Sequence, residues 1–384
     1  MFRALDKWLM GYVKSAAGRP RHVPGLKHLF FCLADHFEPF RGGASKAEAV
    51  SFVREWTEGY ARAVQGIRDA DGRGPRHTFF YPAEDYDADV LDILAGLCGD
   101  GTGEVEIHLH HRNDTAEGLR EKLESFKNTL HQRHGLLGRD AAGRVRYGFV
   151  HGNWALCNSR PDGDWCGVNE ELSVLQATGC YADFTFPSAP SPTQPRMVNA
   201  LYRAWDRQGM PRGADTGVAV KTVGLRPRTL NPSEAQSAVC GLQSKVSSSL
   251  MLITGPLALN WSRRKWGVLP RLENAEISGA NVPSAERIRL WSRQWIHVEG
   301  KPEWVFVKVH THGGVEANRR VILGGAMREA HAALHRDFND GREWRLHYVT
   351  AREMYNLARA AEAGAAGQPD LHRDFEIGPP VAGN

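Results

Sequence analysis

The chain has 384 residues, and its 48 basic residues against 44 acidic ones leave a formal charge of only +4. No block of five or more basic residues occurs, so nucleic acid is not an indicated partner. No apolar run approaches the roughly 18 residues of a membrane span, and the length suits one elaborated α/β barrel or two domains.

The first residues of the chain and its cysteine pattern indicate the cellular compartment in which we expect the protein. Residues 1–21 intersperse Lys and Arg with apolar residues and lack a long apolar stretch followed by a cleavage site, so we expect a cytoplasmic location. The six cysteines form no C-x-x-C pair, which favours reduced thiols. Cys157, Cys166 and Cys180 are close enough in sequence to leave a structural metal or a disulfide open as alternatives.

Short apolar runs alternate with helical patterns along the chain. Between the early runs, apolar residues recur at helical spacing over 46–67, 87–98, 116–134 and 169–178. This order is typical of successive βα units, and hence of a mainly parallel sheet or barrel. The runs that predict buried strands are 28–35, 77–83, 105–111, 147–152, 181–187, 251–255, 304–311 and 344–350.

Residues 187–249 differ from this pattern because they are rich in Pro, Ser, Gly and Thr and carry little periodicity. They predict an insertion over a barrel mouth or a connector between two halves of a barrel. We therefore expect an amino-terminal segment over 1–26, a single distorted (β/α) barrel domain over 27–370, and a loose tail over 371–384.

Polar side chains follow most of the predicted strands at the point where each strand ends. In a βα barrel, this end of the strands lines the active site, whereas the strand bodies fill the core. The pattern predicts a single polar mouth. The groups at strand ends are Asp35-His36, Glu84-Asp85, the 108–114 stretch, His151 to Trp154, Asp183, and His310 with His312.

The stretch 104–114 packs three histidines and an aspartate into the end of an alternating apolar run. In an extended strand, His108 and His110 lie on one side and the apolar residues on the other. His110 and Asp114 converge if a helix follows directly. Imidazole and carboxylate are usual ligands of divalent metals, so the stretch predicts a hydrolytic metal site. Alternatively, Asp114 or Thr115 simply caps the helix and the histidines are polar groups at a strand end.

Two stretches resemble elements of the polysaccharide deacetylase (NodB-homology) family, whose members use a distorted βα barrel, a divalent metal and an aspartate base to remove N-acetyl groups from glycans. In that family, the first strand ends in two adjacent aspartates, a base and a metal ligand. Phe31-Cys-Leu-Ala-Asp-His-Phe-Glu-Pro39 is similar, which implies Asp35 as the base and His36 as a metal ligand.

The second element of the family carries a pair of histidines four residues apart. The frame Glu106-Ile-His-Leu-His110, followed by Asp114, resembles it. The resemblance therefore implies His110 as a ligand and Asp114 as the replacement for the second histidine, and it leaves the roles of His108 and His111 open. The implied cofactor is a divalent metal, with zinc as the expected ion.

Later stretches resemble the family more loosely. The 149–154 loop lacks the arginine that orients the base in the family, a role that His151 could take. The strand 307–312 resembles the one that supplies the general acid, which implies His310, with His312 as the reserve. The implied substrate-binding residues are His151, Asn153, Trp154, Asp183 and His312.

The resemblance implies a metal-dependent hydrolase that cleaves an amide C–N bond to remove an N-acetyl or related acyl group from a glycan, in surface or exopolysaccharide metabolism. Such chemistry needs an activated water, a base and an acid for the leaving amine. One alternative is a non-catalytic glycan-binding or assembly component on the same barrel. Another is a glycoside hydrolase using paired carboxylates, which leaves the histidines unexplained. Its candidates are Glu38, Glu84, Asp85, Glu170 and Glu171.

Overall fold

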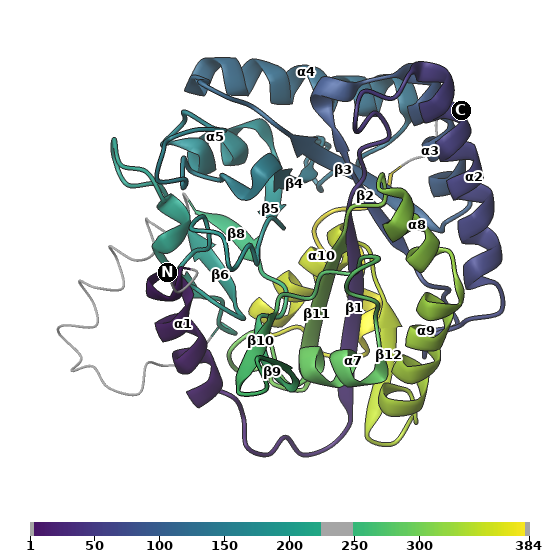
Figure 1. Cartoon of the computed structure of the whole chain (residues 1–384), viewed down its shortest axis with the longest axis vertical. Coiled ribbons are helices and arrows are strands. Elements are labelled where there is room, and N and C mark those ends of the chain that lie inside the picture. Colours follow the sequence, from purple (N-terminus) through teal and green to yellow (C-terminus); the bar gives the residue numbers. More distant parts are fainter. Residues whose placement is uncertain (1–3, 224–248, 381–384) are drawn as a thin grey trace.

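A mostly parallel sheet forms the centre of the molecule, with helices packed around it (Figure 1). The computed structural model describes residues 4–223 and 249–380. All the runs that the sequence predicts as strands form strands, so this part of the prediction is confirmed. They are β1 (Lys27–His36), β2 (His77–Pro82), β3 (Gly103–Leu109), β4 (Tyr147–His151), β5 (Cys180–Asp183), β8 (Leu250–Ile253), β11 (Trp304–Thr311) and β12 (Trp344–Tyr348).

The strand order is β11-β1-β2-β3-β4-β5-β8, and each neighbouring pair in this run is parallel. β12 also pairs in parallel with the first half of β1. Two short strands from the predicted insertion, β6 (Leu201–Ala204) and β7 (Gly217–Ala219), extend the sheet in antiparallel fashion beyond β8. The rest of that insertion, residues 224–248, lies outside the described residues. The parallel run brings the carboxyl ends of its strands to one edge of the sheet.

The helices predicted from apolar spacing are present, with small shifts at their ends. α2 begins at a capping box formed by Ser45 and Glu48. α4 begins after Thr115, whose hydroxyl accepts the amide of Gly118, so the capping role considered for Thr115 is confirmed. The helices are α1 (Leu5–Ala17), α2 (Lys46–Val64), α3 (Ala88–Gly99), α4 (Ala116–His134), α5 (Glu171–Thr178), α7 (Ala285–Ser292), α8 (Glu316–Ile322), α9 (Gly325–Phe338) and α10 (Ala351–Glu362).

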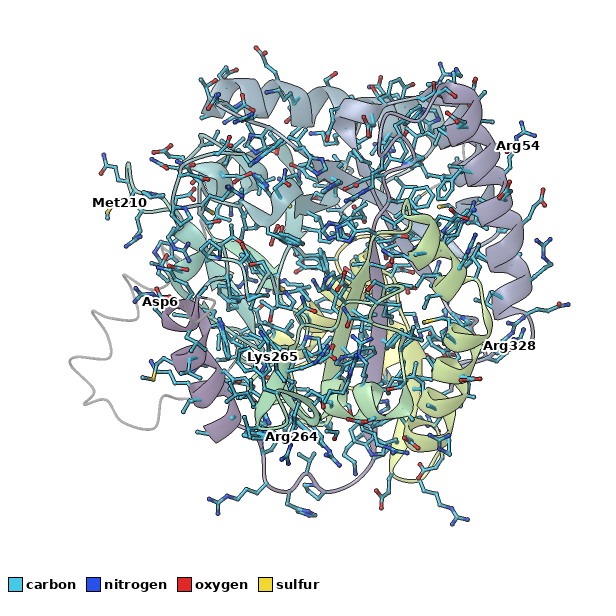
Figure 2. All side chains as sticks on the ribbon, viewed as in Figure 1. Asp6, Arg54, Met210, Arg264, Lys265 and Arg328 are labelled. Carbon is cyan, nitrogen blue, oxygen red and sulfur yellow. The ribbon has the colours of Figure 1, made fainter. Side chains whose placement is uncertain are left out.

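Alternate residues of the strands belong to two separate cores. Leu29, Phe31 and Leu33 of β1 pack in the core that includes Trp56 of α2 and the apolar faces of the other outer helices. The intervening residues of β1 pack in a second core with α10. Side chains fill both layers, whereas Arg54 and Met210 point outward at the periphery (Figure 2). Side chains of β1 therefore face the outer helices or the α10 side according to their parity.

Lys308 of β11 shows that the sheet curls. In a flat sheet, the order β11-β1-β2-β3-β4-β5 separates β11 from β5 by five strand spacings, roughly 24 Å. The Lys308 ammonium nevertheless donates to the carbonyls of Phe184 and Phe186, directly after β5, at 2.6 Å each. The side chain is buried, so it bridges the two sides of the curled sheet inside the molecule.

The curled sheet is not shown to be a closed barrel. Within residues 4–223 and 249–380, no strand ladder joins β11 to β8. The outer edge of β11 instead pairs with residues 275–277, through His310 N to Ala275 O at 3.2 Å and Ile277 N to His310 O at 2.8 Å. The observed architecture is a mixed α/β fold with a mostly parallel central sheet.

The C-terminal tail and a separate hairpin lie outside the main sheet. The predicted loose tail is packed as far as Ile377, because Arg352 of α10 donates to the Ile377 carbonyl at 2.7 Å and both Arg373 and Ile377 are buried. A hairpin of β9 (Ala258–Lys265) and β10 (Leu269–Glu273) stands apart from the main sheet. Among the described helices, none combines the length and the apolar character needed to cross a bilayer.

Candidate metal centres at the carboxyl edge of the sheet

Two clusters of metal-ligating side chains lie where β1, β3 and β4 end. In each cluster, the residues offer one ligand atom apiece, and these atoms lie within 4.8 Å of one another. We call the first the mouth cluster, and it consists of Glu38, His108 and His110. We call the second the buried cluster, and it consists of His111, His151, Cys166 and Glu171.

In the mouth cluster, both imidazoles are anchored through Nδ1. The His108 Nδ1 lies 2.9 Å from the carbonyl of Val150, and the His110 Nδ1 lies 2.5 Å from the Glu84 carboxylate. Since both partners only accept, each Nδ1 carries the proton and each Nε2 of a neutral ring presents a lone pair. These Nε2 atoms face the Glu38 Oε1 at 3.4 Å for His108 and 3.7 Å for His110. With both rings neutral, three lone-pair donors converge, and a metal cation between them, or a proton on one imidazole, relieves the repulsion.

Glu38 is held as a carboxylate. Its Oε2 accepts from the Arg41 guanidinium at 2.7 Å, which leaves Oε1 toward the histidines. Burial alone would raise the pKa of Glu38, but the neighbouring imidazoles of His108, His312 and His110 lower it to about 2. The His110 side chain keeps 27% of its surface exposed and Glu84 keeps 34%. The mouth cluster is therefore reachable from solvent on the His110 side.

Further histidines line the same mouth. The His36 ring lies with its centroid 5.1 Å from that of His108 and 4.7 Å from that of His312. Trp154 stands nearly perpendicular to His312, with ring centroids 6.3 Å apart. Burial, followed by the neighbouring imidazoles, holds the pKa of His36 well below its usual range. The His36 ring is therefore a neutral base.

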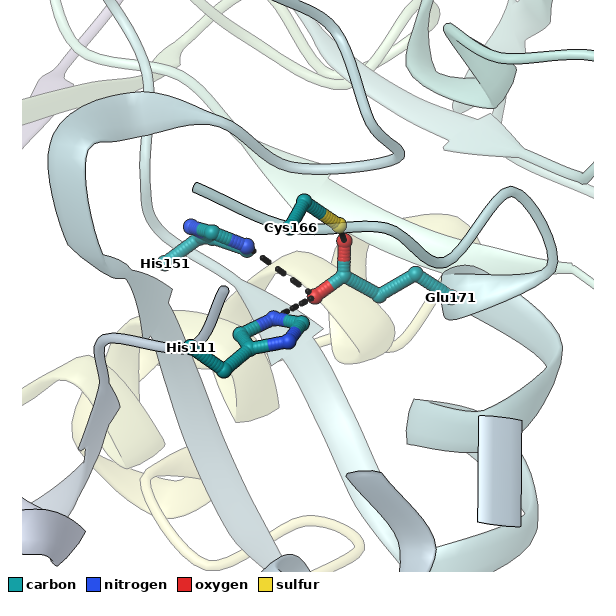
Figure 3. A group of neighbouring side chains, drawn as sticks. All are labelled: His111, His151, Cys166 and Glu171. Atoms are coloured by element: carbon teal, nitrogen blue, oxygen red, sulfur yellow. Dashed lines mark hydrogen bonds and ion pairs between the residues drawn. The ribbon is translucent and has the colours of Figure 1, made fainter. Parts of the chain in front are cut away.

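The buried cluster is built around the Glu171 carboxylate (Figure 3). Its Oε1 lies 3.2 Å from the His111 Nε2 and 3.4 Å from the His151 Nε2. Its Oε2 accepts the Cys157 amide at 2.6 Å and lies 3.4 Å from the Cys166 Sγ. All four cluster residues are buried. Burial lowers the pKa of His151 to about 4 despite the nearby Glu171, so this imidazole is neutral. The buried cluster could hold a metal ion.

Asp35 lies away from both clusters. It is fully buried on the outer-helix side of β1, where Oδ2 accepts from the His77 Nε2 at 2.9 Å. Its Oδ1 accepts the Gly313 amide at 2.5 Å. Gly313 has no room for a side chain, since a Cβ there would overlap the Asp35 carboxylate. Asp35 therefore fixes the backbone directly after His312.

The predicted ligands His36, His110 and Asp114 are not brought together. His110 belongs to the mouth cluster, and His36 lies beside its His108. Asp114 faces the other way, with its Oδ2 3.1 Å from the His111 Nδ1 and 2.7 Å from the Lys122 ammonium. The expectation that His108 and His110 share one side is confirmed, because their ring centroids lie 4.4 Å apart.

The other predicted site residues are divided between the mouth and the interior. His312 and Trp154 lie at the mouth, and Asn153 is exposed beside Trp154. His151 lies in the buried cluster. Asp183 is buried and hydrogen-bonds Thr185, and burial raises its pKa to about 7.

His310 lies deeper than His312. It is only 4% exposed, and its Nδ1 has no hydrogen-bond partner among the described residues.

Several cluster residues had no role as metal ligands in the sequence prediction. Glu38 was considered only as one of a pair of glycosidase carboxylates, and Glu171 likewise. Adjacent residues at a strand end face opposite sides, so His110 and His111 could have been assigned to two sites from parity alone. Glu171 comes from a helix start far along the chain, and no sequence spacing indicates its approach. The spacing of Cys157, Cys166 and Cys180 left a structural metal open, and of the three only Cys166 belongs to the buried cluster. The cysteines at 157, 166 and 180 are free thiols, so no disulfide joins them.

No model of a known protein family matches the chain, and no curated protein matches it in sequence. The resemblance to polysaccharide deacetylases therefore stays a prediction.

Proposed function

We propose that the protein is a metal-dependent hydrolase that removes an N-acetyl or related acyl group from a glycan in surface or exopolysaccharide metabolism. The observation that supports this most is the mouth cluster, where two anchored imidazoles aim free Nε2 atoms at one carboxylate oxygen. Two histidines and one glutamate, with a position left open, form a known type of catalytic zinc site. The curled, mostly parallel sheet also suits the distorted barrel that such enzymes use.

In this proposal, Glu38, His108 and His110 hold a divalent ion, with zinc as the expected one. When bound, such an ion polarises the scissile carbonyl and lowers the pKa of a water molecule. Glu84 and the Val150 carbonyl fix the orientation of the two imidazoles by accepting from their Nδ1 atoms.

The acid and base of the proposed reaction come from the same mouth. Asp85 follows Glu84, and burial together with the Glu84 charge raises its pKa, which suits a carboxylate that takes up a proton. His312 lies beside Trp154 and is less deeply buried than His310, so we assign the donation of a proton to the leaving amine to His312. Asp35 then acts as a positioning residue for His312 through Gly313.

Trp154 supports a sugar as the substrate. Its indole is partly exposed at the mouth, and a flat aromatic face beside a catalytic centre suits stacking against a sugar ring. Glu171, one of the carboxylates considered for glycoside hydrolysis, is fully buried and cannot reach a glycan.

Acetate release from N-acetylated oligosaccharides tests the proposal. The zinc-loaded protein should release acetate, and both chelation and Glu38→Gln should abolish the release. Glu58→Gln, which changes an exposed carboxylate on α2, is the matched control and should behave as the wild type. Oligosaccharide binding without release would favour the glycan-binding component instead. Release that survives chelation would remove the metal from the proposal.

A further inference from the structure

The second cluster, which the proposed reaction does not use, carries an inference of its own. We propose that His111, His151, Cys166 and Glu171 form a four-ligand structural zinc site, separate from the mouth cluster. Each residue supplies one ligand atom, and the four atoms lie within 4.8 Å of one another. Tetrahedral zinc with ligands at about 2.0 to 2.3 Å needs such a grouping after a small contraction.

The proton arrangement around Glu171 is incomplete without a cation. The His151 Nδ1 lies 2.5 Å from the Gly152 carbonyl, so its proton is on Nδ1 and Nε2 presents a lone pair toward Glu171. This Nε2 is buried and has no hydrogen-bond partner among the described residues. His111 lies between two carboxylates: its Nε2 is 3.2 Å from Glu171, and its Nδ1, 3.1 Å from the Asp114 carboxylate, has no hydrogen-bond partner among the described residues.

Zinc would satisfy these groups together. The His111 proton then stays on Nδ1 toward Asp114, and both Nε2 atoms become ligands. The Val168 amide, which lies 3.4 Å from the Cys166 Sγ, donates to a thiolate. The Cys157 amide holds the second oxygen of Glu171 at 2.6 Å. Three of the four proposed ligands therefore have an outer hydrogen-bond partner, and the Asp114 carboxylate lies 3.1 Å from the Nδ1 of the fourth, His111.

The charges also balance. A thiolate and a carboxylate carry two negative charges, the two imidazoles are neutral, and a divalent ion makes the site neutral overall. Without an ion, only a proton on one of the two imidazoles would compensate the fully buried Glu171 carboxylate. An uncompensated buried charge is strongly unfavourable. The mixed sulfur, nitrogen and oxygen set with complete enclosure favours zinc over calcium or magnesium.

The proposed zinc would join three segments that the strands alone leave loose. They are the turn after β3, the end of β4, and the 152–170 loop with the first turn of α5. In that loop, Asn153, Trp154, Cys157, Asn158 and Trp165 all have positive φ angles between 50° and 63°. Residues other than glycine rarely adopt a positive φ unless surrounding contacts enforce it. Since the loop carries Trp154, the zinc would also fix the position of this residue at the mouth.

X-ray absorption at the zinc edge tests the site in the folded full-length chain. The Glu38→Gln variant, which should lose the mouth ion, should keep one zinc per chain with one sulfur neighbour at about 2.3 Å. A zinc shell of nitrogen and oxygen only, or an absence of bound zinc in this variant, would overturn the proposal. The readout does not depend on activity, so failure of the proposed hydrolase reaction would leave it standing.

Cobalt substitution provides the matched comparison. The cobalt-loaded protein should show a thiolate-to-metal charge-transfer band in the near ultraviolet, because the mouth cluster contains no thiol. Cys166→Ser should lose the band, whereas Cys180→Ser, which changes a buried free thiol on β5, should keep it. A band that persists in Cys166→Ser would place the thiolate ligand elsewhere. If Cys166→Ser does not fold, the X-ray absorption result on Glu38→Gln decides the question.

Discussion

The mouth cluster and the buried cluster use imidazole and carboxylate in similar number, but they differ in enclosure and charge. The mouth cluster keeps His110 and Glu84 partly exposed and has three ligands, so a bound ion would retain an open position. The buried cluster offers four potential ligands, including the Cys166 thiol, and all four are buried. An ion there would have neither an open position nor solvent access. We infer that the number of ligands and their exposure distinguish the proposed reaction centre from the proposed structural zinc site.

The adjacent pair His110 and His111 gives the sharpest test of this comparison. His110→Ala should lower turnover on the order of 100-fold or more and remove the mouth ion, because it deletes a ligand of the proposed reaction centre. His111→Ala should instead remove the buried ion and lower the melting temperature. Turnover, metal content and thermal unfolding of both variants would be measured in parallel. Full metal occupancy and turnover in His110→Ala would exclude the mouth cluster as the reaction centre.

The two carboxylate ligands should differ in their effect on stability. Glu171→Gln leaves two histidines and a thiol around an amide in a closed site, and we expect a loss of about 3 to 5 kcal/mol in the free energy of unfolding. Glu38 is also buried, but Arg41 compensates its charge, so Glu38→Gln should cost less, about 1 to 3 kcal/mol. Chemical denaturation in zinc-containing buffer measures both. Equal losses would contradict the division into a structural and a functional cluster.

Asp35 tests whether the mouth cluster works with a base from β1. As a positioning residue, Asp35→Asn should reduce stability by about 1 to 3 kcal/mol, because a buried acceptor of two hydrogen bonds is altered. Turnover should fall by less than about tenfold, well below the typical loss for a general base. The comparison is made by turnover and thermal unfolding. A loss of 100-fold with unchanged stability would restore Asp35 as the base.

Much of the fold follows from local patterns in the sequence. Every predicted strand and each of the four predicted helices is present, because apolar periodicity reports directly which face of an element is buried. The convergence of polar groups at the carboxyl edge follows from the parallel order. The packing of the tail could not be predicted, since it depends on hydrogen bonds that Arg352 and Asn356 of α10 donate to the Ile377 carbonyl.

The sites were less predictable than the elements. The prediction placed Asp35 and His36 together at the mouth, but successive residues of a strand face opposite sides, and Asp35 turns toward His77. The pairing of His110 with Asp114 depended on a turn whose direction the sequence does not specify. In the structure, that turn carries Asp114 to His111 and Lys122 instead. The missing information is the direction of loops, which long-range contacts determine.

A third histidine group, at the opposite end of β1, sharpens the criterion used for both clusters. The His28 Nδ1 lies 2.9 Å from the His347 Nε2, and the His347 Nδ1 lies 2.7 Å from the Asp71 carboxylate. One proton on each Nδ1 satisfies this row, so its paired nitrogens need no cation, and we expect no metal there. Instead of binding a metal, His28 should make the free energy of unfolding depend on pH.

Burial, then the neighbouring His347, lowers the pKa of His28 from 6.5 to about 4. Because the unfolded chain takes up the proton first, the contribution of His28 to stability is complete above pH 6.5 and falls as the pH drops toward 4. The change should be on the order of 3 kcal/mol. His28→Gln should flatten the pH dependence of the free energy of unfolding in this window, whereas exposed His22→Gln should not. Zinc bound at His28, or an unchanged pH profile in His28→Gln, would show that proton counting does not separate metal sites from ordinary histidine pairs in this protein.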